Sequence, residues 1–437
     1  MESVRLAISQ AAGDTAHRNL RGSATSTADL PGASWVKFGD AIAYYGNASD
    51  WPHVSEAAGR ASFPLRDHPH EIDPKHLHVV IQKGNLFQRK HAEIPVILDK
   101  GRFLLVEMHP EQAQRLSGRH APCYSIHPLE AMEATDPRGK NRIVFTAHSG
   151  AAIRASARAA DPAVRELVSG LSRTTYEADL TKLTQFPTRN STTTHFKNAC
   201  NFAKEQFVTM GYATRLQDIA VNGASSANVV AERIGAGAQP RRVVLVTAHL
   251  DSINGHAGGD SAAVAPGADD DGSGSAGVLE IARALRDHHG KNDLQFVLFG
   301  GEEEGMLGSD EFVRSMNTTD RARVQAVVQM DMIGSLNTAM PTVLLEGASL
   351  SQPLIDGLAA AAATYTSLAV QTSLIPADSD HVSFLEKGIA AVLTIEGADR
   401  SNHVIHTAND TLDLINFDLA LEILRMNTAF VVEALRA

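Results

Sequence analysis

The sequence is poor in cysteine, in long apolar runs and in clustered positive charge. Its 437 residues include only Cys123 and Cys200, so no framework of several disulfides can hold the fold. No apolar stretch approaches the roughly 20 residues of a membrane-spanning helix, and residues 1–14 lack the apolar core of a signal peptide. The formal net charge of -11, without a basic stripe, argues against nucleic acid or an anionic membrane as partner.

In other respects the composition is that of an ordinary globular protein. Apolar residues make up 43% of the chain and charged residues 20%, which is typical of such proteins. The length is sufficient for two or three domains. Changes in composition predict a loosely ordered lead-in over 1–35, an accessory or pro-segment α+β domain over 36–155, and a larger domain over 160–437.

Short extended runs dominate the segment that follows the lead-in. We predict a small α+β unit with strands at 77–82, 94–99 and 102–108 and a helix at 110–118. No acidic pattern frames the histidines of this segment, so we expect solvated side chains that bind no metal. These include His68, His70, His76 and His78.

Strands and helices alternate along residues 160–437. Asp161-Pro162 is a good cap and first turn for a helix, and several strands are apolar throughout, as in sheets covered on both faces. We predict an α/β domain with a mixed, largely parallel central sheet flanked by helices. The predicted strands are 226–234, 242–248, 294–299, 324–332, 341–346 and 389–395, and the predicted helices are 191–211, 272–288, 305–316, 351–366, 379–387 and 416–436.

Imidazole and carboxylate side chains follow successive strands of this domain. The carboxyl ends of parallel strands meet at one edge of such a sheet, so these groups should gather there. Imidazole and carboxylate are ligands of divalent metals such as zinc, and two Zn²⁺ ions sharing one carboxylate would balance so many negative charges. The residues are His249, Asp251, the aspartates of 266–274, Glu302, Glu303, Glu304, Asp331, His403 and His406.

The stretch 272-GSGSAG-277 spells the GxGxxG pattern of a dinucleotide site. No predicted strand directly precedes it, and Asp269, Asp270 and Asp271 would repel a pyrophosphate. We interpret the glycines instead as residues that let the backbone turn sharply and present Asp270 inward. The chain contains no HExxH helix, P-loop or GxSxG elbow.

The order and spelling of the motifs resemble the secreted bacterial leucyl aminopeptidase group of the M28 zinc peptidases. The resemblance covers about residues 160–437 and does not extend to the first 150 or so. It implies a phosphorylase/hydrolase-like fold, a zinc-dependent exopeptidase acting on the N-termini of peptides and proteins, and a secreted or periplasmic location. The matching stretches are AHLDS (248–252), APGADDDGSG (265–274), GGEEEGMLGS (300–309), QMDM (329–332), DSDH (378–381) and IHTANDT (405–411).

The resemblance also implies a ligand set for two zinc ions. His249 and Asp331 would hold one ion, and Glu303 and His406 would hold the other. Asp270, the middle aspartate of its cluster, would bridge both ions.

Further roles follow from the same resemblance. Glu302 would be the general base beside the bridging water. Asp251 would orient His249 through its ring N–H, and Asp271 and Asp380 would be further supporting groups. The positions that match the apolar lining of the pocket for the first side chain, and so imply a preference for apolar first residues, are Met332 and Ile405.

One stretch departs from the pattern of the group. Many leucyl members carry a Tyr, in a cysteine-bridged loop shortly before the SDH motif, that assists the tetrahedral intermediate. Here 373-SLIPADSDH-381 has Pro376 near that position and no cysteine. Oxyanion assistance and the shape of the specificity pocket therefore stay open.

Other functions could rest on the same metal-binding core. A single-zinc glutaminyl cyclase would lack the second ligand set, and a non-catalytic binding homologue would tolerate the loss of Glu302 or of a ligand. Neither loss occurs here. A carboxypeptidase or amidohydrolase on the same dimetal core is the main alternative, and it would need a cation at the pocket rim.

Two expectations concern residues without a role in this chemistry. Glu304 has no counterpart in the motif's chemistry, and we expect it at the start of the next helix, partly solvated, where the helix dipole favours an acid. We hypothesise that the N-terminal region packs on the catalytic domain and covers or steers access to the metal cleft, because it precedes a complete catalytic unit.

Overall fold

The computed structural model describes residues 3–10, 29–60, 65–117, 124–135, 139–147, 157–377 and 379–437. The chain divides into two compact units, an N-terminal unit (Met1–Ser149) and a C-terminal unit (Gly150–Ala437). Within the described ranges, no helix has the length and apolar character needed to cross a membrane. Cys200 is buried as a free thiol, whereas Cys123 lies outside the described residues.

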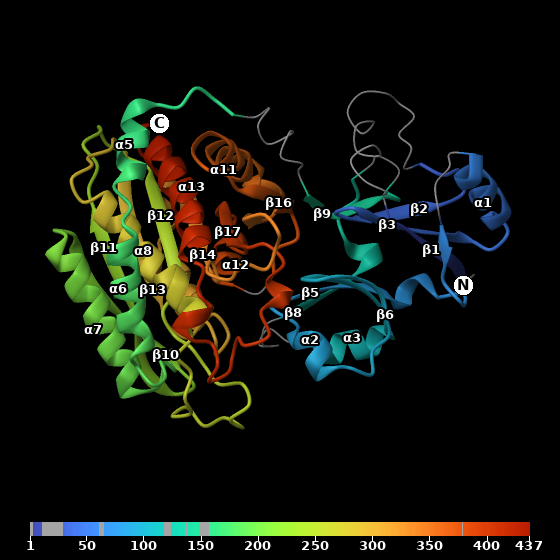
Figure 1. Cartoon of the computed structure of the whole chain (residues 1–437), viewed down its shortest axis with the longest axis horizontal. Helices are drawn as coiled ribbons and strands as arrows, with labels where there is room; N and C mark the ends of the chain where they lie inside the picture. Colours follow the sequence, from blue (N-terminus) through green and yellow to red (C-terminus); the bar gives the residue numbers. More distant parts are fainter. Residues whose placement is uncertain are drawn as a thin grey trace. The chain divides into compact units, whose positions relative to one another are not determined.

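The N-terminal unit contains two sheets (Figure 1). In the first, the strand order is β9-β2-β3-β1-β4, and the helix α1 (Trp51–Arg60) supplies apolar residues to its core. The predicted lead-in is wrong in part, because residues 4–10 form a strand paired along its whole length with β3. The strands are β1 (Val4–Gln10), β2 (Ser34–Phe38), β3 (Ala41–Asn47), β4 (Arg66–Asp67) and β9 (Arg142–Ala147).

The second sheet of this unit has the strand order β6-β7-β5-β8 and is antiparallel throughout. With its helices it forms a βαββαβ motif, in which the two helices pack on one face of the sheet around Phe87 and Ala113. The strands predicted in this segment are present with small shifts at their ends. The elements are β5 (Leu77–Gln82), α2 (Leu86–Lys90), β6 (Val96–Lys100), β7 (Phe103–Glu107), α3 (Pro110–Leu116) and β8 (Tyr124–Pro128).

The C-terminal unit is built on a mixed sheet in the order β10-β11-β13-β12-β14-β17-β15-β16. The central strands β13, β12, β14 and β17 are parallel neighbours. Strand β11 is antiparallel to both strands beside it, whereas β15 is antiparallel to β17 and parallel to β16. The predicted fold class is therefore confirmed. The strands are β10 (Ala213–Val221), β11 (Ala224–Arg233), β12 (Val243–His249), β13 (Asp293–Phe299), β14 (Val324–Met330), β15 (Thr342–Glu346), β16 (Ala369–Ser373) and β17 (Ala391–Glu396).

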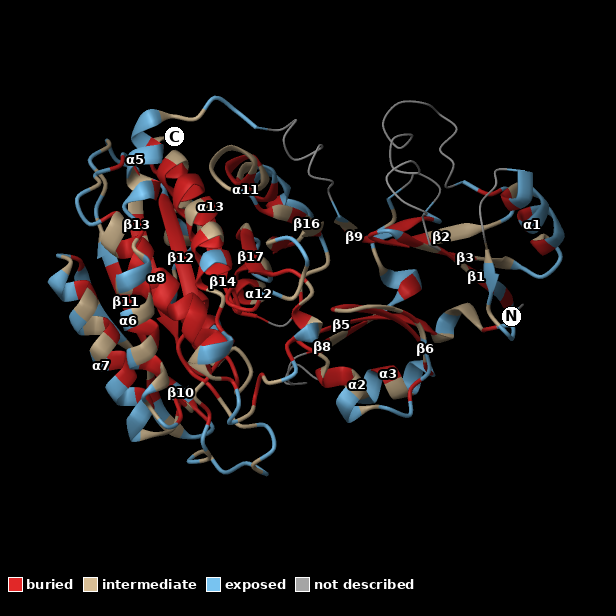
Figure 2. Ribbon diagram, viewed as in Figure 1, coloured by how far each residue is buried: buried red, intermediate tan, exposed pale blue. Residues whose placement is uncertain are grey.

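Helices cover both faces of this sheet, and its central strands are buried (Figure 2). One face packs against a large apolar core to which α5, α6, α7, α8, α11 and α13 contribute, and the other against α9 and α12 through Phe312 and Phe384. Asp161 caps α5 as predicted. The helices are α5 (Pro162–Ser169), α6 (Arg173–Thr184), α7 (Thr194–Thr209), α8 (Gly274–Ala284), α9 (Leu307–Ser315), α10 (Thr318–Arg323), α11 (Gln352–Tyr365), α12 (His381–Leu385) and α13 (Phe417–Arg436).

Candidate metal centre

Buried imidazole and carboxylate groups meet at the carboxyl edge of the C-terminal sheet. Parallel pairing of β12 with β13 and β14 ends these strands at the same edge. His249 is the last residue of β12, and Asp331 directly follows β14. The remaining members lie in the turn that precedes α8 (Asp270), after β13 (Glu302 and Glu303) and in the loop after β17 (His406).

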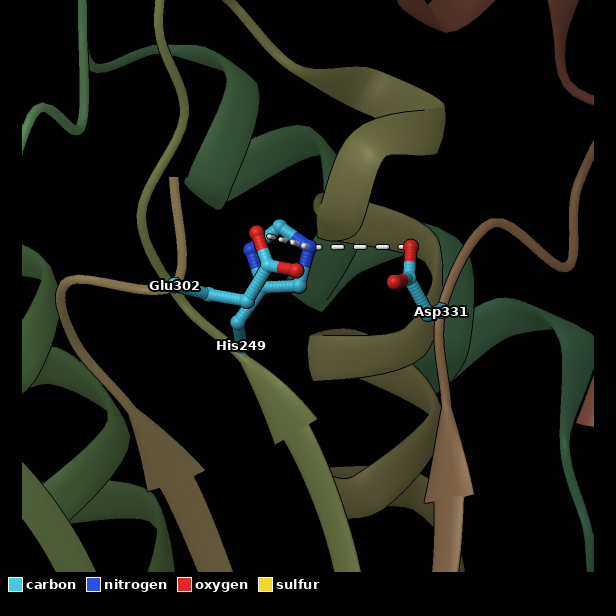
Figure 3. Close-up of side chains that lie close together, drawn as sticks. All are labelled: His249, Glu302 and Asp331. Atoms are coloured by element: carbon cyan, nitrogen blue, oxygen red, sulfur yellow. Dashed lines mark ion pairs between the residues drawn. The ribbon is translucent and has the colours of Figure 1, made fainter. Parts of the chain in front are cut away.

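One group of potential ligands consists of His249, Glu302 and Asp331. Figure 3 shows their side chains converging on one space from the ends of neighbouring strands. The Nε2 atom of His249 lies 3.6 Å from Asp331 Oδ1 and 3.9 Å from Glu302 Oε2. All three side chains are buried.

A second group consists of Asp270, Glu303 and His406. Glu303 Oε2 lies 2.9 Å from Nε2 of His406. Asp270 connects the two groups, because its Oδ1 is 3.2 Å from Nε2 of His249 and its Oδ2 is 3.0 Å from Nε2 of His406. The two oxygens of one carboxylate thus face two imidazoles, as a carboxylate shared between two metal ions requires.

The chemistry of this cluster fits divalent metal ions. Both ring nitrogens of His249 and both carboxylate oxygens of Glu303 are buried and make no hydrogen bond within the described part of the chain. A buried polar group without a hydrogen bond costs about 1–3 kcal/mol. Imidazole nitrogen and carboxylate oxygen are zinc ligands, so a metal would satisfy Nε2 of His249 and the carboxylate of Glu303, while Nδ1 of His249 faces Asp251.

The electrostatics of the cluster favour the same interpretation. Burial lowers the pKa of His249, but the surrounding carboxylates outweigh burial and raise it well above its usual value. Burial raises the pKa of Glu303 and of Asp271, even though an imidazole stands beside each of them. The protein's own charges therefore do not balance the cluster, and a bound cation would do so.

Asp251 links His249 to the turn that carries the two glutamates. Its Oδ1 lies 3.6 Å from Nδ1 of His249. The same carboxylate accepts the backbone N–H groups of Glu302 at 3.3 Å and Glu303 at 3.1 Å. A carboxylate in this place fixes the ring orientation of a metal-binding imidazole.

Asp271 joins three segments around the cluster. It accepts the backbone N–H groups of His249 at 3.2 Å, Met332 at 3.2 Å and Gly274 at 2.9 Å. It therefore holds the ends of β12 and β14 against the start of α8, at the level where His249 and Asp331 present their side chains.

The segment that contains Asp380 supports Asp331 through Ser379, the residue before Asp380. Ser379 donates a hydrogen bond from Oγ to Oδ2 of Asp331 at 2.7 Å, and Asp380 accepts one from the amide of Gln329 at 3.3 Å. Sequence reasoning singled out Asp380 but missed Ser379, although both belong to the same motif. The motif alone did not say which of its polar groups contacts a ligand.

The residues predicted to line a substrate pocket lie beside potential ligands. Met332 and Ile405 are both buried, and Met332 has φ 54° directly after Asp331. Their contact with a substrate side chain stays a prediction.

The expectation for Glu304 is wrong in part: the residue is half-buried, as expected, but it does not begin the next helix. The next helix, α9, begins only at Leu307, and both carboxyl oxygens of Glu304 are buried without a hydrogen bond in the described residues. Burial and the nearby Asp251 raise the pKa of Glu304 to about 9. A pKa of this size favours the protonated carboxyl group at pH 7 in the metal-free chain.

The sharp turn before Asp270 is made by a different glycine from those predicted. Gly267 has φ 53°, and a Cβ there would come within 2.5 Å of the Asp270 carbonyl oxygen. Gly272 and Gly274 instead allow close packing, since a Cβ on Gly274 would come within 2.4 Å of the Asp271 carboxylate. At position 267, only glycine tolerates both the positive φ and the close approach of the Asp270 carbonyl oxygen.

The histidines of the N-terminal unit take no part in a metal group formed by described residues. The expectation of solvated side chains is wrong for His78, which is buried because β5 is an inner strand of its sheet. Its Nδ1 lies 3.0 Å from the carbonyl oxygen of His76. His70 is exposed as expected.

Comparisons with known proteins agree with the geometry of the cluster. Residues 228–431 match peptidase family M28. Leucine aminopeptidase 1 of Fusarium vanettenii is 30% identical over 293 residues, which cover 62% of this chain and 72% of the relative. Leucine aminopeptidase 1 of Grosmannia clavigera is 29% identical over 371 residues, which cover 79% of this chain and 89% of the relative.

The second of these matches is longer than residues 160–437 alone can supply. It therefore reaches into the N-terminal region, and the expectation that similarity stops near residue 160 is wrong.

Two solved structures show the same fold, and the second is a zinc aminopeptidase. LapB from Legionella pneumophila has a TM-score of 0.56 at 20% identity, over 82% of this chain and 99% of that chain. BSAP, a zinc aminopeptidase from Bacillus subtilis, has a TM-score of 0.53 at 16% identity, over 60% of this chain and 95% of that chain. Together with the sequence matches, these results show that the chain belongs to peptidase family M28 and is an enzyme of the hydrolase class.

Proposed function

We propose that the chain is an aminopeptidase that uses two zinc ions. His249 and Asp331 would hold one ion, Glu303 and His406 the other, and Asp270 would bridge them. The observation that supports this most directly is the position of the Asp270 carboxylate, with one oxygen 3.2 Å from His249 and the other 3.0 Å from His406. When bound, the ions would activate a shared water and polarise the scissile carbonyl.

Glu302 is the proposed general base. Its Oε2 lies 3.9 Å from Nε2 of His249, so a water at the centre of the cluster is within its reach. Glu302 takes a proton from that water as it attacks the carbonyl carbon and gives the proton to the leaving amine. Asp251 holds the backbone of Glu302 while this happens, through the bond from its N–H.

The substrates proposed are peptides and proteins with a free N-terminus. The free α-amino group of the substrate would be held by one metal ion and the nearby carboxylates, which confines cleavage to the first residue. The buried apolar side chains of Met332 and Ile405 favour an apolar first residue. The names of the curated relatives, which are leucine aminopeptidases, agree with this preference.

Two further proposals concern the setting of the enzyme. The chain acts outside the cytoplasm, as the leucyl group that it resembles does. The N-terminal unit is an accessory or pro-segment that packs on the catalytic unit and steers access to the cleft. Removal of residues 1–155 should change folding yield or activity, and an unchanged yield with unchanged activity would contradict this role.

The test of the activity is a panel of aminoacyl anilides with different first residues. Cleavage should be fastest for apolar residues, stop after treatment with a chelator and return when zinc is added. An N-acetylated substrate should resist cleavage. Activity that survives removal of the metal, or cleavage of blocked substrates at the same rate, would contradict the proposal.

A further inference from the structure

The segment that presents Asp270 is held by the charged side chains of two residues from other parts of the chain. This bridge segment, residues 266–272, connects the loop after β12 to α8 and includes two residues with non-helical backbone angles, Asp270 and Asp271. These two residues interrupt the regular geometry of the π-helical turn over Ala268–Ser273. The position of the segment therefore depends on the groups that contact its backbone.

The first of these residues is Arg189, whose guanidinium group is completely buried. It donates to the carbonyl oxygens of Gly267 at 2.9 Å and of Pro266, both in the bridge segment. Its Nε donates to the carbonyl oxygen of Leu250 at 2.7 Å. Leu250 directly follows His249, so Arg189 ties the bridge segment to the end of the strand that carries this imidazole.

The second residue is Asp410, which is also buried. Its Oδ1 accepts the backbone N–H of Asp269 at 2.9 Å, and its Oδ2 accepts the backbone N–H of Asp270 at 3.0 Å. Its own carbonyl oxygen accepts the N–H of Ala268 at 3.1 Å. Asp410 belongs to the loop that carries His406, so it ties the bridge segment to this second imidazole.

The contacts require the length of these two side chains and the number of hydrogen-bond donors or acceptors that each one carries. The guanidinium of Arg189 presents donors in a fixed planar fork, which the single ammonium of lysine cannot reproduce. The carboxylate of Asp410 offers an acceptor to each of two neighbouring N–H groups. An amide in its place would turn one acceptor into a donor that faces a donor.

We propose that Arg189 and Asp410 are positioning residues that place the bridging carboxylate of Asp270, each relative to one half of the metal centre. Arg189 sets the distance from Asp270 to His249, and Asp410 sets the distance from Asp270 to His406. This inference rests on the proposed two-metal site. It adds that the two halves are adjusted by separate residues, neither of which is placed to touch a metal ion or a substrate.

The test measures metal binding to the full chain in which one half of the site has been disabled. His406→Ala leaves the His249 half, and His249→Ala leaves the His406 half. Each protein is stripped with a chelator and titrated with Co²⁺, which is followed by visible absorption, and with Zn²⁺ by equilibrium dialysis. Groups that position metal ligands typically change metal affinity by about 10–100-fold.

The expected pattern is crossed. Arg189→Met should weaken Co²⁺ binding about 10–100-fold in the His406→Ala protein, and Asp410→Asn should do so in the His249→Ala protein. Arg189→Met in the His249→Ala protein, and Asp410→Asn in the His406→Ala protein, should change the affinity for Co²⁺ by less than about threefold. Arg189→Lys, which keeps the charge but not the planar fork, should lie between wild type and Arg189→Met, and it replaces that variant if Arg189→Met does not fold.

Two substitutions serve as matched controls. Arg283 is a partly buried arginine that pairs with Asp179 and Glu280, and Asp293 is a carboxylate that accepts the backbone N–H of Gly235 at 2.8 Å. Arg283→Met and Asp293→Asn should lower the melting temperature and leave the Co²⁺ spectrum unchanged.

Two outcomes would overturn the inference. Either Arg189→Met and Asp410→Asn weaken both halves equally, or they lower only the melting temperature, as the controls do. Failure of the proposed function is a separate result: a wild-type chain that binds Co²⁺ in two steps but cleaves no aminoacyl anilide would contradict the activity and leave the crossed pattern measurable.

Discussion

The two halves of the metal centre are built on different kinds of backbone. His249 ends a central strand and Asp331 directly follows the neighbouring one, whereas His406 lies in a loop with φ 57° and Glu303 lies in a turn. His249 is 0% exposed and His406 is 7% exposed. Groups on strands hold their geometry more tightly than groups on loops. The half formed by His249 and Asp331, the strand half, should therefore be preformed. The half formed by Glu303 and His406, the loop half, should depend more on the residues that support it and on bound metal.

The largest effect is expected from a pair of neighbouring residues that serve different halves. Glu302→Gln should lower kcat by about 10²–10⁴-fold, the usual contribution of a general base, and keep both metal ions bound. Glu303→Gln should lose the metal of the loop half, because its carboxylate lies 2.9 Å from His406. Steady-state kinetics combined with metal counting measures both.

This pair tests whether base and ligand have been assigned correctly. If Glu302→Gln lost a metal ion and Glu303→Gln kept both, the two roles would have to be exchanged. The substitution of Glu311, on α9 outside the cluster, by Gln provides the control, which should change neither quantity.

The next largest effect concerns the order in which metal leaves. His406→Ala should retain about one metal ion per chain, held by the strand half. His249→Ala should retain less, because the loop half then lacks the rigid partner across Asp270. Dialysis against increasing chelator should remove the metal of the loop half first from the wild type. Equal retention by the two variants would show that backbone type does not distinguish the halves.

The strand half is also the part of the site that sequence reasoning predicted best. Apolar runs such as 294–299 identified the strands, and their ends located His249, Glu302 and Asp331. Strand β10 was missed because it lies at the edge of the sheet and its sequence, ATRLQDIAV, mixes polar and apolar residues. Edge strands lack the continuous apolar pattern on which such predictions depend.

Supporting groups were harder to predict than ligands. Arg189 contacts four backbone carbonyl groups and no motif surrounds it, and nothing in the sequence says which carbonyls converge in space. Glu304 was misplaced for a related reason. Its environment includes Asp251, which is distant in sequence. The resemblance to a family supplied residue roles, and the structure supplied the contacts between segments.

A smaller effect is expected from a hydroxyl group that supports the strand half alone. Ser379 donates a hydrogen bond to Asp331 at 2.7 Å. Ser379→Ala should therefore lower the affinity for the metal ion of the strand half by about 10-fold and leave the affinity for the other ion unchanged. The matched control is Ser383→Ala, which removes a buried hydroxyl that bonds Asp310 instead. Competition with a chromophoric chelator measures both affinities. Equal weakening of the two ions would mean that Ser379 does not act on one half.

The last prediction concerns the stability of the metal-free chain and Glu304, which lies beside Asp251 and has no proposed ligand role. The pKa of Glu304 is about 9 in the folded chain, against a reference value of 4.5. The folded chain therefore keeps a proton that the unfolded chain loses as the pH rises above about 4.5. The stability that this proton contributes is complete below that pH and is lost as the pH rises towards 9.

Glu304→Gln keeps a neutral group at every pH and should remove this loss. In chelator, its free energy of unfolding should exceed that of the wild type near pH 9, by about 1.4 kcal/mol for each unit by which the folded chain raises the pKa of Glu304, and the difference should vanish near pH 4. Urea unfolding across this range measures it, with Glu311→Gln as control. Glu304 stands beside Asp251, which contacts both His249 and the backbone of Glu303. Any effect of the substitution on Asp251 should therefore reach both halves alike, and the relative affinity of the two metal ions should not change. Parallel stability curves for variant and wild type would show that Glu304 is ionised in the folded chain, and Asp251 would then need another neutralising partner.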